Sequence, residues 1–164
     1  MQPDENLKKT PLYTEHEKLK ARIVPFGGWL MPIQYSGVLG EHKAVREHVG
    51  IFDVSHMGEI VVSGDEAQTF LQYVLMNDIT KLVPGKGQYS GLLNDEGGFV
   101  DDLIVYQLGP KEYLLCVNAA NSDKDFAWLK EKQSDFNVSV ENQSPNWAQI
   151  AVQGPNSRDL TMRV

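Results

Sequence analysis

A turn signal between two β-rich runs constrains the fold of this chain more than any other feature. Residues 94–98 read Asn-Asp-Glu-Gly-Gly, and runs rich in apolar and β-branched residues flank them at 87–92 and 99–108. Asn, Asp and Gly favour the backbone conformations of a tight hairpin turn. A third such run follows at 112–117. The sequence therefore predicts an α+β protein with mixed or antiparallel sheets and packed helices, not a doubly wound parallel sheet.

Helical patterns alternate irregularly with these strands. An apolar stripe predicts a helix over 65–75, formed by Ala67, Phe70, Leu71 and Val74. Other helices are predicted from Thr10-Pro11 up to Pro25, over 40–49, and over 122–132 with Ser122 as the cap. Strands are predicted at 58–63, 136–141 and 148–154, and the aromatic, Gly- and Pro-rich residues 26–35 are expected to be irregular.

Composition restricts the classes of function. The chain has 164 residues, with 15 Lys and Arg against 22 Asp and Glu and a formal net charge of −7. Nucleic-acid binding needs a concentrated cationic face, so this charge balance argues against it. A hydrophobic content of 41% with 23% charged residues is typical of a globular protein, and the length favours one domain.

The single cysteine and the N-terminal residues bear on the compartment. Cys116 lies in the apolar run Tyr-Leu-Leu-Cys-Val, which favours a buried, unreactive thiol and a reducing environment. The N-terminus lacks the apolar core of a secretory signal, and no window approaches the ~18 apolar residues of a membrane span. We therefore expect a cytoplasmic protein that does not contact a membrane.

The two ends of the chain lead to further expectations. Residues 1–9 are polar and are expected to be flexible, so the structured region is predicted to span 10–164. A helical pattern begins at Pro155 and stops at Val164. A helix so short is marginal unless its apolar side packs against something. We therefore expect the chain to be the N-terminal part of a longer protein.

Adjacent carboxylates follow the turn signal. Asp101 and Asp102 open the apolar run of residues 103–106, and strand alternation places their side chains on opposite faces. A carboxylate directed inward is costly unless it is paired, hydrogen-bonded or placed in a ligand cleft. The pair is therefore either a turn cap with a structural ion pair or a source of one ligand-binding carboxylate.

Other polar and aromatic residues leave alternatives open. Asp53, Ser55 and His56 lie close in sequence but lack the elbow motif or ligand spacing of a hydrolase or metal site, which favours a structural loop. Tyr35, Tyr89 and Tyr106 suit either the core or the wall of a pocket for a flat ring. The amides of Asn118 and Asn121 suit either a ligand edge or the cap of the following helix.

Several sequence blocks together resemble the T-protein of the glycine cleavage system, the aminomethyltransferases. They are Thr10-Pro11-Leu12, Phe26-Gly27-Gly28-Trp29-Leu30-Met31-Pro32, Val45-Arg46-Glu47, the run from Gly50 to Glu59, Gly97-Gly98-Phe99-Val100-Asp101-Asp102, Val117-Asn118-Ala119-Ala120-Asn121 and Gln153-Gly154-Pro155. The resemblance extends nearly from Leu7 to the last residue. It implies the first lobe of a three-lobed fold with folate in a central channel.

The resemblance also implies an activity. Aminomethyltransferases take the aminomethyl group from the dihydrolipoyl arm of the lipoylated H-protein, release ammonia and transfer the one-carbon unit to tetrahydrofolate as 5,10-methylenetetrahydrofolate. Asp102 takes the place of the family's key aspartate near the reacting nitrogens, where it would hold and polarise the amine. Four further residues fall on family positions around the folate, namely Met57, Tyr89, Tyr106 and Asn118. Asp53, Ser55 and His56 resemble structural residues of the family.

Two other functions are compatible with the resemblance. Related folate-binding modules occur in demethylating dehydrogenases that act on sarcosine or dimethylglycine, and in a non-enzymatic iron-sulfur maintenance family. The blocks around His56 and Asp102 favour the aminomethyltransferase. Family members are about twice as long as this chain, and the remaining half supplies further folate ligands, so the resemblance assigns the activity to the whole protein and leaves that of the isolated chain open.

Overall fold

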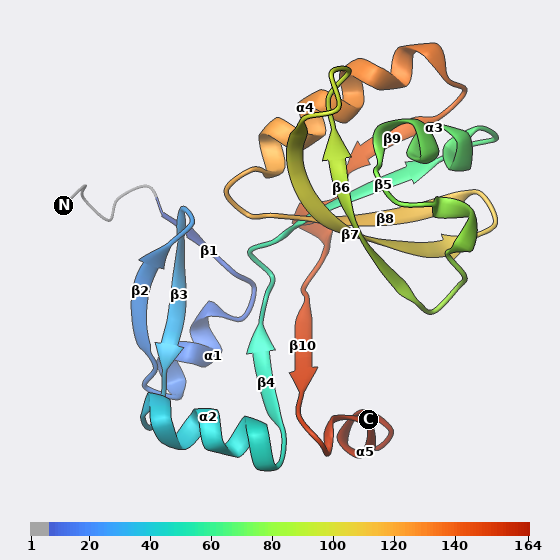
Figure 1. The fold of residues 1–164 in the computed structure, drawn as a ribbon. Coiled ribbons are helices and arrows are strands. Elements are labelled where there is room, and N and C mark those ends of the chain that lie inside the picture. The colour runs from blue at the N-terminus through green and yellow to red at the C-terminus, as the bar shows by residue number, and fades with distance from the viewer. Residues whose placement is uncertain (1–6) are drawn as a thin grey trace. The chain divides into compact units, whose positions relative to one another are not determined.

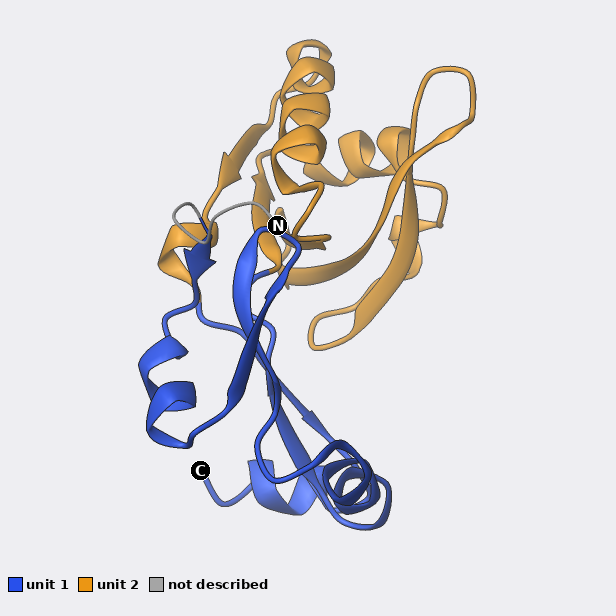
Figure 2. Ribbon diagram, turned by 90° about the vertical axis from the view of Figure 1, so that its left-hand side faces the viewer, with its two compact units in different colours: residues 1–56, 148–164 blue, residues 57–147 orange. Residues whose placement is uncertain are grey.

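The computed structural model describes residues 7–164, which form two compact units (Figures 1 and 2). Unit 1 combines Met1–His56 with Ala148–Val164, and unit 2 is the intervening segment Met57–Trp147. The chain thus passes from unit 1 into unit 2 and, after residue 147, returns to unit 1. The expected flexible segment 1–9 lies mostly outside the described residues, but Lys8–Lys9 form the short strand β1.

A five-stranded antiparallel sheet in the order β6-β7-β8-β5-β9 forms the frame of unit 2. Its strands are β5 (Gly58–Ser63), β6 (Gly87–Leu93), β7 (Phe99–Gly109), β8 (Glu112–Val117) and β9 (Ser139–Asn142). The helices are α3 (Ala67–Val74) and α4 (Ser122–Lys132), with short 3-10 turns η2 (Ile79–Lys81), η3 (Gln133–Asp135) and η4 (Ser144–Asn146). The predicted α+β class with antiparallel sheets is confirmed.

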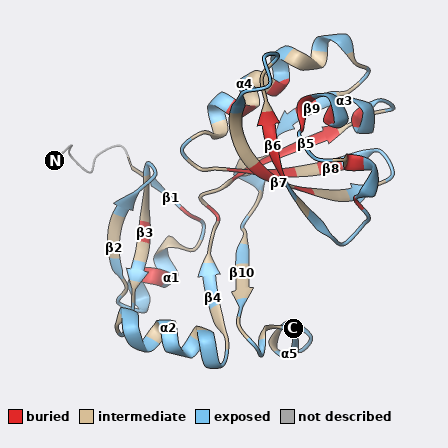
Figure 3. Ribbon diagram, in the orientation of Figure 1, coloured by how far each residue is buried: buried red, intermediate tan, exposed pale blue. Residues whose placement is uncertain are grey.

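One face of this sheet holds the core of unit 2 (Figure 3). Ile60, Leu103 and Leu115 project from the strands toward the predicted apolar stripe of α3, and Leu129 joins them from α4. Phe70 is fully buried. These side chains supply most of the hydrophobic stabilisation of the unit. Cys116 is buried, as predicted, but its side chain belongs to the opposite face.

Unit 1 contains two small sheets. In the first, β3 (Trp29–Gln34) lies between β1 and β2 (Arg22–Phe26). In the second, β4 (Gly50–Asp53) pairs antiparallel with β10 (Ile150–Gln153), so the return segment completes this unit. The helices α1 (Tyr13–Lys18), α2 (Val38–Glu47) and α5 (Ser157–Thr161) accompany them.

The helix predicted from Thr10-Pro11 is present as α1 but ends at Lys18 instead of reaching Pro25, and the prediction that residues 26–35 are irregular is wrong. The φ of 57° at Lys20 breaks the helical path, and a β2–β3 hairpin follows. Gly27 and Gly28 form its turn with φ values of 55° and 86°, the left-handed conformations of a two-residue hairpin turn. Pairing with β1 and β2 stabilises extended backbone in a segment whose local composition indicated a loop.

Gly64, directly after β5 in unit 2, lies against the backbone of Asn137. Its φ is 132°, and a Cβ placed there would lie 2.6 Å from the backbone oxygen of Asn137. We expect Gly64→Ala to lower the free energy of unfolding by about 2 kcal/mol or more, because the strained backbone and the clash add together. Urea denaturation measures the change.

Gly85 provides the matched control for this substitution. Its φ is 80°, but no atom lies within 4 Å of a Cβ added there. Gly85→Ala should therefore cost only the conformational part, about 1 kcal/mol. Equal losses in both variants would contradict the importance of the contact with Asn137.

Candidate functional site

The predicted folate-binding residues share one face of the unit 2 sheet. The register aligns Tyr89 with Ile104, Ile104 with Cys116, and Cys116 with Glu59 across four strands. Residues directly opposite one another in antiparallel strands point to the same face. Tyr89, Asp102, Tyr106 and Asn118 therefore lie on the face opposite the core, and Met57 continues this face just before β5.

Asp102 is held from two sides. Its Oδ1 accepts a 2.6 Å hydrogen bond from Nδ2 of Asn118, and its Oδ2 accepts one from the hydroxyl of Tyr89. The hydrogen bond to the Asp102 carboxylate, followed by burial and the negative charges of Asp102 and Asp101, raises the pKa of the Tyr89 phenol, which therefore keeps its proton. The structure thus brings three of the predicted site residues into direct contact.

Two aromatic rings flank this carboxylate because glycines make room for them. A Cβ on Gly87 would lie 2.8 Å from Cε1 of Tyr106, and a Cβ on Gly91 would overlap the ring of Phe99. The rings therefore lie directly over the backbone of β6. Burial, assisted by Cys116, raises the pKa of the Tyr106 phenol.

Phe99 extends the aromatic surface and was not predicted from the sequence. Its side chain is 66% exposed, similar to Tyr89 at 65%. Isolated glycines within a strand signal a close approach by another group, and Gly87 and Gly91 carried that signal. The result is a hydrogen-bonded carboxylate on an open aromatic surface, the chemistry that a flat heteroaromatic ring bearing N–H groups requires.

Asp101 lies on the opposite face from Asp102, as alternation predicts, but its carboxylate is not a turn cap. It accepts hydrogen bonds from Nδ2 of Asn118 at 3.1 Å and from Nδ2 of Asn121 at 3.0 Å. The alternative that these amides cap α4 is wrong, because Asn121 occupies the N-cap position without a side-chain cap bond. The prediction that Ser122 is the cap is wrong for the same reason.

Comparison with known proteins assigns the family. The model of the GCVT N-terminal domain matches residues 12–164. The chain belongs to the GCVT N-terminal domain family. The aminomethyltransferase of Staphylococcus epidermidis is 54% identical over 155 residues, which cover 94% of this chain and 43% of the relative. That of Deinococcus deserti is 52% identical and is matched over 96% of this chain and 44% of the relative.

A solved structure supports the fold of this GCVT domain. The glycine cleavage system aminomethyltransferase T from Bartonella henselae superposes with a TM-score of 0.89 at 40% identity. The match covers 96% of this chain and 43% of that one. The chain thus spans less than half the length of the aminomethyltransferases that it matches.

Asp53 anchors a separate polar network in unit 1 of the GCVT domain. Its Oδ2 accepts hydrogen bonds from Thr10 Oγ1 at 2.6 Å and meets His16 Nε2 at 2.8 Å, while Oδ1 accepts from the amide of Ser55. The hydroxyl of Ser55 also bonds the backbone of Gln149. These contacts confirm the structural interpretation of Asp53 and Ser55.

The ring of His56 makes an aromatic contact in the same unit. Among residues 7–164 no hydrogen-bond partner reaches its buried Nδ1, and the ring packs edge-on against Phe26. Burial lowers the pKa of His56 against the opposing effect of Asp53. His56 is therefore a neutral ring in an aromatic contact.

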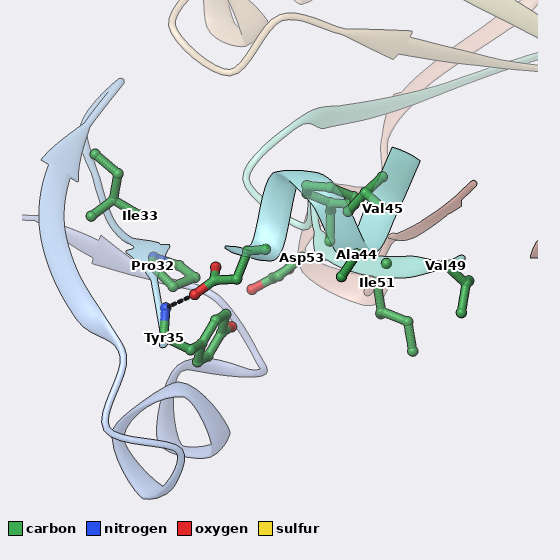
Figure 4. Close-up of a pocket in the computed structure, with 11 residues that line it drawn as sticks. Pro32, Ile33, Tyr35, Ala44, Val45, Val49, Ile51 and Asp53 are labelled. Atoms are coloured by element: carbon green, nitrogen blue, oxygen red, sulfur yellow. Dashed lines mark hydrogen bonds between the residues drawn. The ribbon is translucent and has the colours of Figure 1, made fainter. Parts of the chain in front are cut away.

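A cavity of about 280 Å³ lies in unit 1 between β3, α2 and β4 (Figure 4). Its polar groups are already used within the protein, because Glu41 Oε1 accepts the amides of Tyr35, Ser36 and Gly37 at 2.6–2.8 Å. Tyr35, predicted as a pocket tyrosine, lines this cavity and bonds His16 through its hydroxyl. With its polar groups satisfied, the cavity offers less to a polar ligand than the Asp102 face does.

Two other kinds of feature are absent from the described part of the chain. Within residues 7–164 no cluster of three or more His, Cys, Asp or Glu side chains is arranged to hold a metal ion. No helix in that range is long and apolar enough to cross a membrane.

Proposed function

We propose that this chain forms the folate-binding N-terminal part of an aminomethyltransferase of the glycine cleavage system. The observation that carries the proposal is the Asp102 carboxylate, held by Asn118 and Tyr89 on an open aromatic surface, in a member of the GCVT N-terminal domain family. The acceptor of the one-carbon unit is tetrahydrofolate, and the donor is the aminomethylated dihydrolipoyl arm of the H-protein.

In the proposed reaction the methylene carbon exchanges its two heteroatom partners. The C–S bond to the lipoyl arm and the C–N bond to ammonia break, while C–N bonds to N5 and N10 of tetrahydrofolate form. The protons from N5 and N10 leave on the thiol and on ammonia, so the step needs no oxidant. Positive charge develops on carbon and nitrogen during this exchange, and the Asp102 carboxylate would stabilise it.

The other site residues would bind and orient the folate. The rings of Tyr89, Tyr106 and Phe99 offer faces for stacking the pterin and aminobenzoyl groups, and Met57 offers a polarisable thioether. Asn118 holds Asp102 and leaves its own amide oxygen for a polar edge of the ligand. The names of the relatives favour this function over a demethylating dehydrogenase module or an iron-sulfur maintenance factor.

Titration of tetrahydrofolate into the 164-residue chain tests the binding half of the proposal. We expect saturable binding that Asp102→Asn weakens about tenfold or more, because a neutral amide loses the charge-assisted hydrogen bond. Asp65→Asn is the matched control, since it makes the same change at an exposed carboxylate paired with Lys111. Equal binding by the Asp102→Asn and Asp65→Asn variants would contradict the site.

The catalytic half requires the part that the matched relatives have beyond this chain. A hybrid in which residues 7–164 replace the corresponding part of the Staphylococcus epidermidis aminomethyltransferase provides it. We expect the hybrid to release ammonia from aminomethylated H-protein in the presence of tetrahydrofolate, and Asp102→Asn to lower its kcat about 100-fold. A folded hybrid that binds tetrahydrofolate but releases no ammonia would contradict the proposed reaction.

A further inference from the structure

A second acidic residue lies behind the site, on the first turns of α4. Asp125 is fully buried, at 0% exposure, and it faces the carboxylate of Asp101. Within residues 7–164 neither of its oxygens has an N–H or O–H group as a hydrogen-bond donor. A buried carboxylate and a neighbouring one repel each other unless one of them carries a proton that the other accepts.

The surrounding charges decide which carboxyl group holds that proton. Asp101 receives amide donors from Asn118 and Asn121, whereas the ammonium of Lys124 lies 3.7 Å from Oδ1 of Asp125. That ammonium is directed mainly to the backbone oxygen of Val100, at 2.6 Å. Asp101 is thus the better-solvated anion, and Asp125 is the better site for a proton.

The titration behaviour of the two groups agrees with this geometry. Burial, then the hydrogen bond and negative charge of Asp101, raise the pKa of Asp125 to about 7, and Lys124 opposes them only in part. Burial alone would raise the pKa of Asp101, but hydrogen bonds from Asp125 and from the Asn121 and Asn118 amides lower it. Below about pH 7 a proton therefore stays between the two.

We infer that Asp125 is a positioning residue, which donates its proton in a hydrogen bond to Asp101 and so fixes the amide that holds Asp102. Asn118 is the link, because its Nδ2 lies 3.1 Å from Asp101 Oδ1 and 2.6 Å from Asp102 Oδ1. This inference rests on the proposed folate site. Asp125 is an addition to the site residues named above, because no hydrogen bond described for it reaches Asp102 or the aromatic surface.

Loss of the Asp125 proton would disturb the proposed folate site and lower its affinity for folate. With both carboxylates charged, Asp101 is repelled from α4, and Lys124 offsets the charge only in part. Asn118 would then follow Asp101 or release it, and in either case its hydrogen bond to Asp102 changes. Folate affinity should therefore fall as the pH rises through the titration of Asp125.

The test has one readout that is independent of folate. In the 164-residue chain, ¹³C NMR of the aspartate carboxyl carbons should show Asp125 titrating near pH 7 and Asp101 titrating below the ordinary aspartate pKa of 3.8. Titration of Asp125 below pH 5 would overturn the inference even if tetrahydrofolate binds as proposed.

The second readout compares tetrahydrofolate affinity in variants between pH 6 and 9. The affinity of the unaltered chain for tetrahydrofolate should fall about fivefold over this range. The amide in Asp125→Asn can donate a hydrogen bond at every pH, so this variant should abolish the part of the fall that is due to Asp125. Asp125→Ala should bind more weakly at every pH, and Asp123→Asn should behave as the unaltered chain. An unchanged pH profile in a folded Asp125→Asn variant would overturn the inference.

Discussion

Replacing Asp53 by alanine should lower the free energy of unfolding of unit 1 by about 3–5 kcal/mol. The side chain of Asp53 is 1% exposed and binds Thr10, His16 and the amide of Ser55. Removing it leaves three polar groups without their shared partner, in a place where water cannot readily replace it. Hydrogen exchange of the β4 and β10 amides, which report on unit 1 alone, measures the loss.

Glu15→Ala is the control for this prediction. Glu15 lies on α1 in the same unit, and its pair with Lys18 is exposed on both sides. An exposed pair of this kind contributes at most about 1 kcal/mol. Similar losses from the two substitutions would show that burial of the Asp53 network contributes little.

The pH dependence of the Asp53 network follows from its hydrogen bonds. Burial alone would raise the pKa of Asp53, but bonds from Thr10, His16 and Ser55 outweigh it and lower the pKa below 3.8. The stabilisation is therefore complete above the ordinary aspartate pKa and is lost as the pH falls through the lower, folded-state value.

The second large effect concerns Glu59, which should make unit 2 less stable as the pH rises. Glu59 is 2% exposed, and no partner reaches its Oε1 among residues 7–164. Burial raises its pKa to about 7, against the opposing hydrogen bond of Ser144. A raised carboxyl pKa gives stability that is complete below the unfolded pKa of 4.5 and is lost as the pH rises through 7.

Glu59→Gln should remove this part of the pH dependence, which amounts to about 3 kcal/mol between pH 4 and 8. Urea denaturation at a series of pH values, for the chain and the variant, measures it. Asp125 contributes in the same direction in both proteins, so the difference between the two curves isolates Glu59. Glu141→Gln, on the neighbouring strand β9 and exposed, should leave the curve unchanged. A variant curve parallel to that of the chain would contradict a protonated Glu59.

Much of unit 2 was predictable because local signals and tertiary contacts agree there. The turn at residues 94–98 and the stripe on α3 are both found where the sequence indicated. In unit 1 the local signals and the tertiary contacts disagree. The helical spacing up to Ile23 was overridden by the β2–β3 hairpin, which depends on pairing with β1 and on the left-handed turn at Gly27 and Gly28.

Part of the candidate site was predictable from the sequence. Alternation along β7 was enough to separate Asp101 from Asp102, and the family resemblance selected Tyr89, Tyr106, Asn118 and Met57. The structure brings Tyr89, Asp102 and Asn118 into contact, and their role in binding folate stays a prediction. The burial of Asp125 and Glu59 arises from contacts with other elements, so no local pattern could reveal it.

The interrupted chain path of unit 1 has a consequence for the order in which the molecule folds. Strand β4 must wait for β10, a partner about a hundred residues later, and closing so long a loop between flexible ends is entropically costly. Unit 2 is continuous and joins its own ends, since Glu59 bonds the amide of Gln143 and the hydroxyl of Ser144 through its backbone. Once unit 2 has folded, the effective loop between β4 and β10 shrinks to a few residues on each side. We therefore expect unit 2 to fold first during synthesis. Its folding shortens the loop between β4 and β10, so that unit 1 is completed rapidly.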